Sequence, residues 1–121
     1  MKIESFEQIE SWKEARKLVQ NVYAISRDRR DFGFKDQIQR ASISVMSNIA
    51  EGFDRGSNKE FIQFLVIARG SVSEVKSLAY AGLDVGYFTP VLFETTVKNC
   101  TELSSMINGF IRYLKNSDRK C

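Results

Sequence analysis

The sequence predicts an all-α protein, an antiparallel up-down-up-down four-helix bundle. Apolar residues recur at spacings of three and four through most of the chain, which is the period of an amphipathic helix. One proline and seven glycines among 121 residues are too few for the closely spaced turns of an all-β sandwich. Short polar corners separate four such stretches, so consecutive helices should run antiparallel.

The first two helices are predicted over residues 6–27 and 35–55. Ser5 precedes a glutamine by three residues, and Asp36 does the same, so both have the spacing of an N-terminal capping box. The second helix ends at a short corner, residues 52–57, which lacks the spacing of a phosphate-binding glycine loop. We interpret it as an ordinary connection, although a helix N-terminus with basic flanks can also hold a phosphate.

The third helix is predicted over residues 58–85, and its start is the clearest boundary in the chain. Ser57 and Glu60 form a capping box directly before an apolar residue. Gly70 and Gly82 interrupt the helix, where each costs on the order of 1 kcal/mol relative to alanine. We expect Gly70 to allow the close approach of a neighbouring helix, and Gly82 to do the same or to help end the helix.

The fourth helix is predicted over residues 90–115, because Thr89 is a good N-cap and proline follows it at the first helical position. Cys100 lies on the apolar face of this helix and is predicted to be buried. Cys121 is the last residue, and we expect an exposed thiol without an assigned role. Two cysteines predict no disulfide scaffold and suit a reducing cytoplasm.

The composition disfavours several classes of function. The chain contains no histidine, which rules out His-based catalytic triads, His-containing zinc sites and histidine acid–base chemistry. We therefore expect no cofactor and predict that the protein is not an enzyme. The N-terminus lacks the apolar core of a secretory signal, and no run of about 18 apolar residues could span a membrane. A cytoplasmic location is expected.

Polar residues and glycines gather beside the apolar faces of the second and third helices. They comprise Asn48, Glu51, Gly52, Arg55, Gly70, Ser71 and Glu74. Antiparallel pairing could bring Arg69 near the middle of the second helix, and we expect a coupling between Arg69 and Glu51. A hydrogen-bond and salt-bridge network that sets the packing register explains this set best. The alternatives are a subunit contact or a polar anchor for a ligand, and a catalytic carboxylate pair is disfavoured because no nucleophile or metal ligand accompanies it.

Basic residues offer a possible contact with nucleic acid. The candidates are Lys13, Arg16, Lys17, Arg40, Arg55, Lys59 and Arg69. The formal net charge of +3 permits such contact without requiring it, and the arginines in residues 27–30 suit the dipole of a helix C-terminus equally well. The aromatic residues expected to be partly exposed are Tyr80, Tyr87, Phe88 and Tyr113, and they are not interleaved with these cations. Binding would therefore depend on phosphate contacts and weaken with salt.

Three motifs in the second and third helices carry a family resemblance. They are Asn48-Ile49-Ala50-Glu51-Gly52-Phe53, Lys59-Glu60-Phe61 and Ala68-Arg69-Gly70-Ser71. The chain resembles, in these motifs, the four-helix-bundle proteins named for 23S ribosomal RNA intervening sequences. The resemblance extends to Trp12 and to the closing stretch around Phe110, so it covers nearly the whole chain. One departure is Met46, where many members carry proline, and the second helix should be less kinked here.

The resemblance implies a bundle that assembles into a ring, commonly a homopentamer. It also relates the chain to the accessory variability determinant of diversity-generating retroelements, a basic pentamer that binds nucleic acid and a reverse transcriptase. The present chain is less basic than such a protein. The leading hypothesis is a non-enzymatic homo-oligomer that associates with RNA or DNA, and with a reverse transcriptase only in a retroelement setting. The alternative is a protein-interaction or scaffold module without an RNA role.

Overall fold

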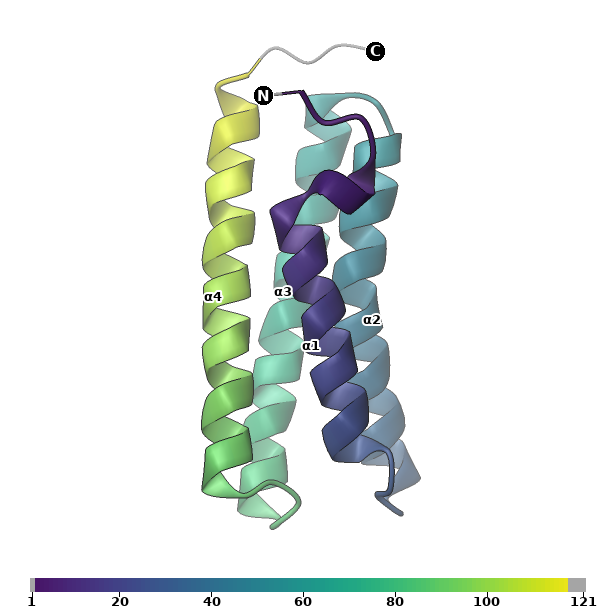
Figure 1. Ribbon diagram of the computed structural model, residues 1–121, viewed down its shortest axis with the longest axis vertical. Helices are drawn as coiled ribbons and strands as arrows, with labels where there is room; N and C mark the ends of the chain where they lie inside the picture. Colours follow the sequence, from purple (N-terminus) through teal and green to yellow (C-terminus); the bar gives the residue numbers. More distant parts are fainter. Residues whose placement is uncertain (1, 118–121) are drawn as a thin grey trace.

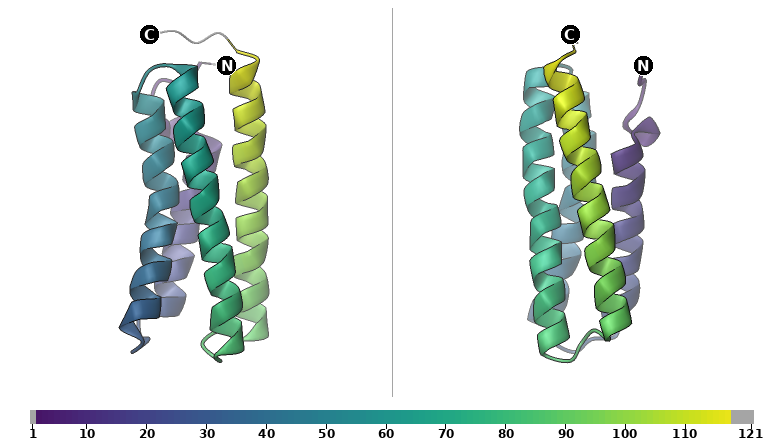
Figure 2. Two further views of the ribbon diagram at one scale, coloured as in Figure 1. Left: turned by 180° about the vertical axis from the view of Figure 1, so that it is seen from behind. Right: turned by 90° about the vertical axis from the view of Figure 1, so that its left-hand side faces the viewer.

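The computed structural model describes residues 2–117, which form a bundle of four long helices (Figure 1). The elements in order are a 3-10 helix η1 (Phe6–Gln8), then α1 (Glu10–Ser26), α2 (Phe32–Asp54), α3 (Asn58–Asp84) and α4 (Pro90–Lys115). Consecutive long helices run antiparallel, and each packs against its neighbours in chain order, with α4 closing against α1 (Figures 1 and 2). The predicted all-α, up-down-up-down bundle is confirmed.

The start of the first helix differs from the prediction. The chain forms η1, becomes extended at Ile9 and only then enters α1. Ser5 makes no capping hydrogen bond with its side chain, and Gln8 Oε1 instead accepts one from the Glu4 N–H, at 2.9 Å. The residue in the capping position of α1 is apolar Ile9, so no side chain caps the first turn of this helix.

The second helix begins at Phe32, earlier than the predicted start at residue 35. Its cap is Asp31, whose Oδ1 accepts a hydrogen bond from the Phe34 N–H at 3.1 Å. Asp36, which was expected to cap the helix, lies inside it and pairs with Arg40 one turn later, at 2.9 Å. Asp31, in the loop before the helix, therefore provides the cap that the sequence spacing had assigned to Asp36.

The caps of α3 and α4 follow the sequence pattern. Ser57 Oγ accepts a hydrogen bond from the Glu60 N–H at 3.3 Å, and Thr89 Oγ1 accepts one from the Leu92 N–H at 3.2 Å. Within residues 2–117, no helix combines the length and apolar character needed to cross a membrane.

One apolar core runs along the bundle and receives side chains from all four helices. Its largest fully buried members are Leu18, Val22, Ile38, Val45, Ile49, Phe61, Leu65, Val72, Val75, Cys100, Leu103 and Ile107. Phe88 was expected to be partly exposed, but it is buried and packs edge-to-face on Phe34, with ring centroids 6.0 Å apart. The corner between α3 and α4 thus closes one end of the core.

Neighbouring side chains pack closely against Gly52 and Gly82 but not against Gly70. A Cβ atom added to Gly52 would lie 2.5 Å from Phe64 Cβ and 3.0 Å from Phe61 Cδ1. One added to Gly82 would lie 3.1 Å from an aromatic ring. Gly70 is exposed with nothing within 4 Å, so the expectation that it admits a neighbouring helix of the bundle is wrong.

The two glycines Gly52 and Gly70 form a matched pair for a stability test. Gly52→Ala should lower the free energy of unfolding by about 2–3 kcal/mol, because the new methyl group overlaps Phe64. Gly70→Ala should raise it by about 0.5–1 kcal/mol, because alanine favours the helix and meets no neighbour. Urea unfolding of both variants would measure this, and equal effects of the two substitutions would contradict the packing at Gly52.

The Cys100 thiol should be unreactive in the folded protein. Burial raises its pKa to about 12 from an ordinary value of 9.0, so the thiol stays protonated at pH 8. We expect a Cys121→Ser variant to react with an aromatic disulfide reagent only after unfolding in urea. The raised pKa contributes stability that is present below pH 9 and is lost as the pH rises toward 12. Rapid labelling of the native variant at pH 8 would contradict the burial.

Candidate functional site

A short hydrogen-bond chain joins α2 to α3 at the predicted polar cluster. Asn48 Nδ2 donates to the Ser44 carbonyl at 2.8 Å and to Ser44 Oγ at 3.0 Å. Ser71 Oγ on α3 donates to the same Ser44 Oγ, at 3.0 Å. All three residues are half-buried, so these bonds fix the register of the two helices. The sequence analysis did not include Ser44 in the polar cluster. The signal that could have indicated it is its position one helical turn before Asn48.

The charged residues of the cluster do not pair as expected. Arg55 Nη2 donates to Glu51 Oε2, one turn earlier on the same helix, at 3.1 Å, and the two side chains form an ion pair. The Arg55 guanidinium also lies 5.0 Å from the centroid of the Phe64 ring. Arg69 instead reaches α4, where its Nη1 donates to Asn108 Oδ1 at 2.7 Å. The predicted Glu51–Arg69 contact is therefore wrong, because Arg69 points to the other neighbour of α3.

Glu74 is exposed and, together with Ser44 of the hydrogen-bond chain, lines a shallow hollow of about 500 Å³ between α2 and α3. The hollow is also lined by Asp36 and Arg40, which form an ion pair with each other. Within residues 2–117, no three His, Cys, Asp or Glu residues are grouped so that they could hold a metal ion. The cluster as a whole is a set of helix-to-helix contacts with an exposed carboxylate at its edge.

The basic residues predicted on α1 gather on its outward face. Lys13, Arg16 and Lys17, together with Gln20, line a shallow hollow of about 230 Å³. Each lysine pairs with a glutamate three residues earlier, at 3.0 and 3.1 Å, and remains about half or more exposed. The Arg16 guanidinium lies 5.9 Å from the centroid of the Trp12 ring. Three cations are thus held near one another on the surface, and we call this set the α1 basic face.

The remaining predicted cations lie on α2 and α3. Arg40 and Arg55 are exposed, and each is paired with a carboxylate on its own helix. Lys59 is exposed in the first turn of α3, whereas Arg69 is half-buried in its bond to Asn108. The α1 members of the predicted set, by contrast, line a common hollow.

A polar clamp, not expected from the sequence, joins the two corners at one end of the bundle. Arg29 Nη2 donates to the Tyr87 carbonyl at 2.5 Å, and the Tyr87 hydroxyl donates to Asp31 Oδ2 at 2.8 Å. The pKa of Asp31 is lowered, first by the hydrogen bond from the Phe34 N–H and then by the Tyr87 hydroxyl. Its negative charge in turn raises the pKa of Tyr87 through that hydrogen bond. Arg29, one of the arginines in residues 27–30, thus has a structural role.

Two further contacts use buried polar side chains. Gln39 Nε2 on α2 donates to Ser26 Oγ at the end of α1, at 3.0 Å. At the opposite end, Asn58 Nδ2 donates to the carbonyls of Leu114 and Ser117, both at 3.2 Å, and so caps the C-terminus of α4. These residues read as ordinary polar positions in the sequence, because their partners are distant along the chain.

Comparison with known proteins supports the family resemblance. A family model described as 23S rRNA-intervening sequence protein matches residues 7–109. A crystal structure at 1.70 Å of a protein of unknown function, from the S23 ribosomal protein family of Bacteroides thetaiotaomicron VPI-5482, superposes with a TM-score of 0.79. The two share 20% sequence identity, over 84% of this chain and 97% of that chain, so this likeness concerns the fold alone. No curated protein matches the chain.

The matched segment includes all three motifs of the second and third helices that carry the resemblance. It also spans α1, α2, α3 and most of α4, which together build the bundle. The protein belongs to the 23S rRNA-intervening sequence protein family.

Proposed function

We propose that this protein is a non-enzymatic, homo-oligomeric bundle that contacts the phosphates of RNA through the α1 basic face. The observation that carries this proposal is the grouping of Lys13, Arg16 and Lys17 around one hollow on the outward side of α1. Cations held at this spacing can contact successive phosphates of one strand, while base readout is not required. The family name, which refers to ribosomal RNA, is in keeping with this choice of nucleic acid.

The local ion pairs do not prevent such contacts. Lys13 and Lys17 share their charge with glutamates in exposed pairs, which typically contribute less than about 1 kcal/mol. A phosphate can therefore replace the glutamate at little cost. Arg16 has no carboxylate partner within 4.0 Å among residues 2–117, and its guanidinium can donate two hydrogen bonds to one phosphate.

The non-enzymatic part of the proposal rests on how the polar cluster is used. Asn48, Ser71 and Arg69 are engaged in contacts between helices, and Glu51 is paired with Arg55. Such residues set packing register, and none combines a nucleophile with an adjacent base.

We also infer a reducing cytoplasmic location, in keeping with the free thiol of Cys100.

Self-assembly is proposed through the outward face of α3, and we infer a homopentamer. Val66 and Ile67, neighbours on this helix, are 43% and 52% exposed, which leaves two large aliphatic side chains in water. Because α1 and α3 are diagonal in the bundle, without close approach of their backbones, assembly through the outward side of α3 leaves the α1 basic face accessible.

The RNA contact predicts a specific loss of binding. A Lys13→Gln/Arg16→Gln/Lys17→Gln variant should bind single-stranded RNA more weakly, with the slope of log K against log salt reduced by about 2, because three phosphate contacts are lost. Fluorescence anisotropy at several salt concentrations would measure this. The matched control is Lys98→Gln/Arg112→Gln/Lys115→Gln, which removes the same charge from the exposed side of α4. No binding by the parent protein at low salt, or equal losses in both variants, would contradict the proposal.

Assembly through α3 is tested by placing a charge on its outward face. Ile67→Glu should convert the proposed pentamer to monomers, because a carboxylate would be buried in the apolar contact. Val91→Glu on α4 is the control, since Val91 is even more exposed, at 71%. Native mass spectrometry at micromolar concentration would report the state of both variants. A monomeric parent protein would overturn the assembly proposal.

A scaffold role without RNA is the second candidate, and the exposed apolar face of α3 favours it. The two candidates differ in one measurement, because only the first requires RNA binding at low salt. A protein that assembles but does not bind RNA would support the scaffold role.

A further inference from the structure

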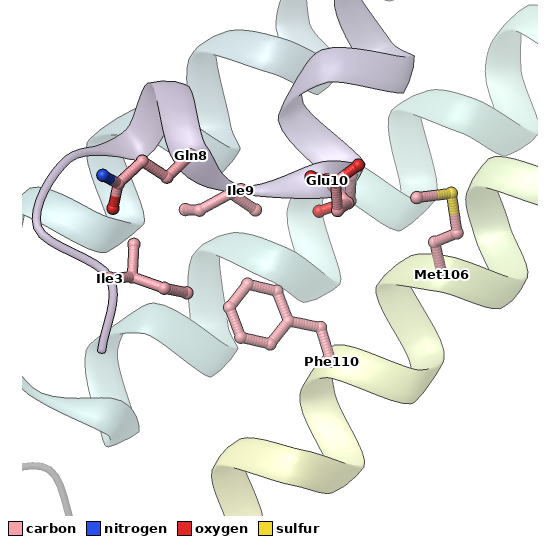
Figure 3. Close-up of a pocket in the computed structure, with 7 residues that line it drawn as sticks. Ile3, Gln8, Ile9, Glu10, Met106 and Phe110 are labelled. Atoms are coloured by element: carbon pink, nitrogen blue, oxygen red, sulfur yellow. The ribbon is translucent and has the colours of Figure 1, made fainter. Parts of the chain in front are cut away.

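Two small hollows lie against α4, and they differ in the side chains that line them. The first lies between the N-terminal segment and α4, where Ile3, Ile9 and Phe110 form apolar walls (Figure 3). The second, which we call the α3–α4 hollow, has a volume of about 190 Å³ and lies between two helices that pack side by side (Figure 2). Most of the side chains that line it are polar, and these are Ser73, Lys76, Thr101, Ser104 and Ser105. The α3–α4 hollow therefore offers several hydrogen-bond donors in one place.

The serine hydroxyls of the α3–α4 hollow are not used within the protein. Elsewhere in the bundle a helical hydroxyl donates to the carbonyl four residues earlier, as Ser26 and Thr96 do. Among residues 2–117, the side chains of Ser73, Ser104 and Ser105 make no hydrogen bond. Ser73 and Ser105 are exposed, and Ser104 is half-buried with its hydroxyl oxygen still accessible. All three hydroxyls can therefore donate to a molecule that enters the hollow from solvent.

Lys76 supplies the positive charge of the hollow and has no ion-pair partner. Its Nζ donates to Thr101 Oγ1 across the helix pair, at 3.3 Å, which leaves the Thr101 hydroxyl hydrogen free to donate to a ligand. Among residues 2–117, no carboxylate oxygen lies within 4.0 Å of Nζ, since all four ion pairs of that part of the chain belong to α1 and α2. Burial raises the pKa of the Cys100 thiol beside the hollow, and the Lys76 charge partly offsets that rise. The hollow thus combines an unpaired cation with hydroxyl donors from both helices.

We propose that the α3–α4 hollow binds a small phosphate monoester. Its phosphate group has three terminal oxygens and a charge of about −2 at pH 8, so it accepts hydrogen bonds from the Lys76 ammonium and from hydroxyls of both helices at once. A carboxylate has two oxygens and a single charge, and it leaves some of these donors without an acceptor. The volume leaves room for a short carbon chain beside the phosphate, since a cavity of about 150 Å³ holds benzene. The proposal is independent of the RNA contact, because no residue of the hollow lies on α1.

Three small anions test the proposal on the full chain. Propyl phosphate carries the monoester, dimethyl phosphate has the diester group of a nucleic-acid backbone, and butyrate is a carboxylate with a carbon chain of the same length. Titration at pH 8 and constant ionic strength is followed by NMR through the backbone amides of Ser73, Thr101 and Ser105, which line the hollow. We expect propyl phosphate to bind about tenfold more tightly than either of the other anions, because it adds a charge and an acceptor oxygen. Equal binding of propyl phosphate and dimethyl phosphate would contradict the choice of a monoester.

Substitutions on the two helices locate the site. Lys76→Gln should weaken the binding of propyl phosphate about tenfold, and Lys76→Arg should restore most of it because the charge is kept. Thr101→Val keeps the shape of the side chain but removes its hydroxyl, and should weaken binding about fivefold. The control Lys59→Gln removes a cation from the first turn of α3, where a helix N-terminus could hold a phosphate instead, and should leave the affinity unchanged. The proposal would be overturned by equal losses in Lys76→Gln and Lys59→Gln, by tightest binding of butyrate, or by no shift of the three amides with propyl phosphate.

Discussion

The geometry of the α2–α3 hairpin depends on Gly52, which has no side chain at the point where the two helices meet. At Gly52 the two backbones approach until Phe61 and Phe64 pack against the glycine itself. Any larger residue would force the helices apart. The Arg55 guanidinium then lies over the Phe64 ring, and further along the same pair of helices Ser71 reaches Ser44. All of these contacts depend on the same alignment of α2 against α3. This is why glycine, polar and aromatic residues occur together in the sequence of these two helices.

Local signals in the sequence were enough to predict the fold class. The apolar periodicity indicated each helix, and the caps at Ser57 and Thr89 marked two starts, because such signals depend on neighbouring residues. Contacts between distant segments could not be predicted in this way. The orientation of Arg69 toward Asn108, and the burial of Phe88 beside Phe34, depend on how the helices are rotated about their axes. Gly70 and Gly82 look alike in the sequence, and only the packing distinguishes the open position from the closed one.

The polar residues fall into two groups with different consequences for function. Those between helices are engaged in structural contacts, as Asn48, Ser71 and Arg69 are. Others remain on the surface, and among these the cations of the α1 basic face line one hollow. A family signature centred on α2 and α3 therefore reports how the bundle is built, while the proposed RNA contact lies on α1, outside these motifs.

The cap that Asn58 provides for α4 has a consequence for how the chain matures. Asn58 stands at the beginning of α3, but its amide donates to the Leu114 carbonyl, 56 residues further along. During synthesis α3 emerges well before its partner has been made, so the amide must stay hydrated until Leu114 has been added to the chain. The end of the bundle near Asn58 can therefore close only after the ribosome has finished α4. A chain that stops short of Leu114 lacks this cap, and apolar surface left exposed at that end makes such a chain prone to aggregate.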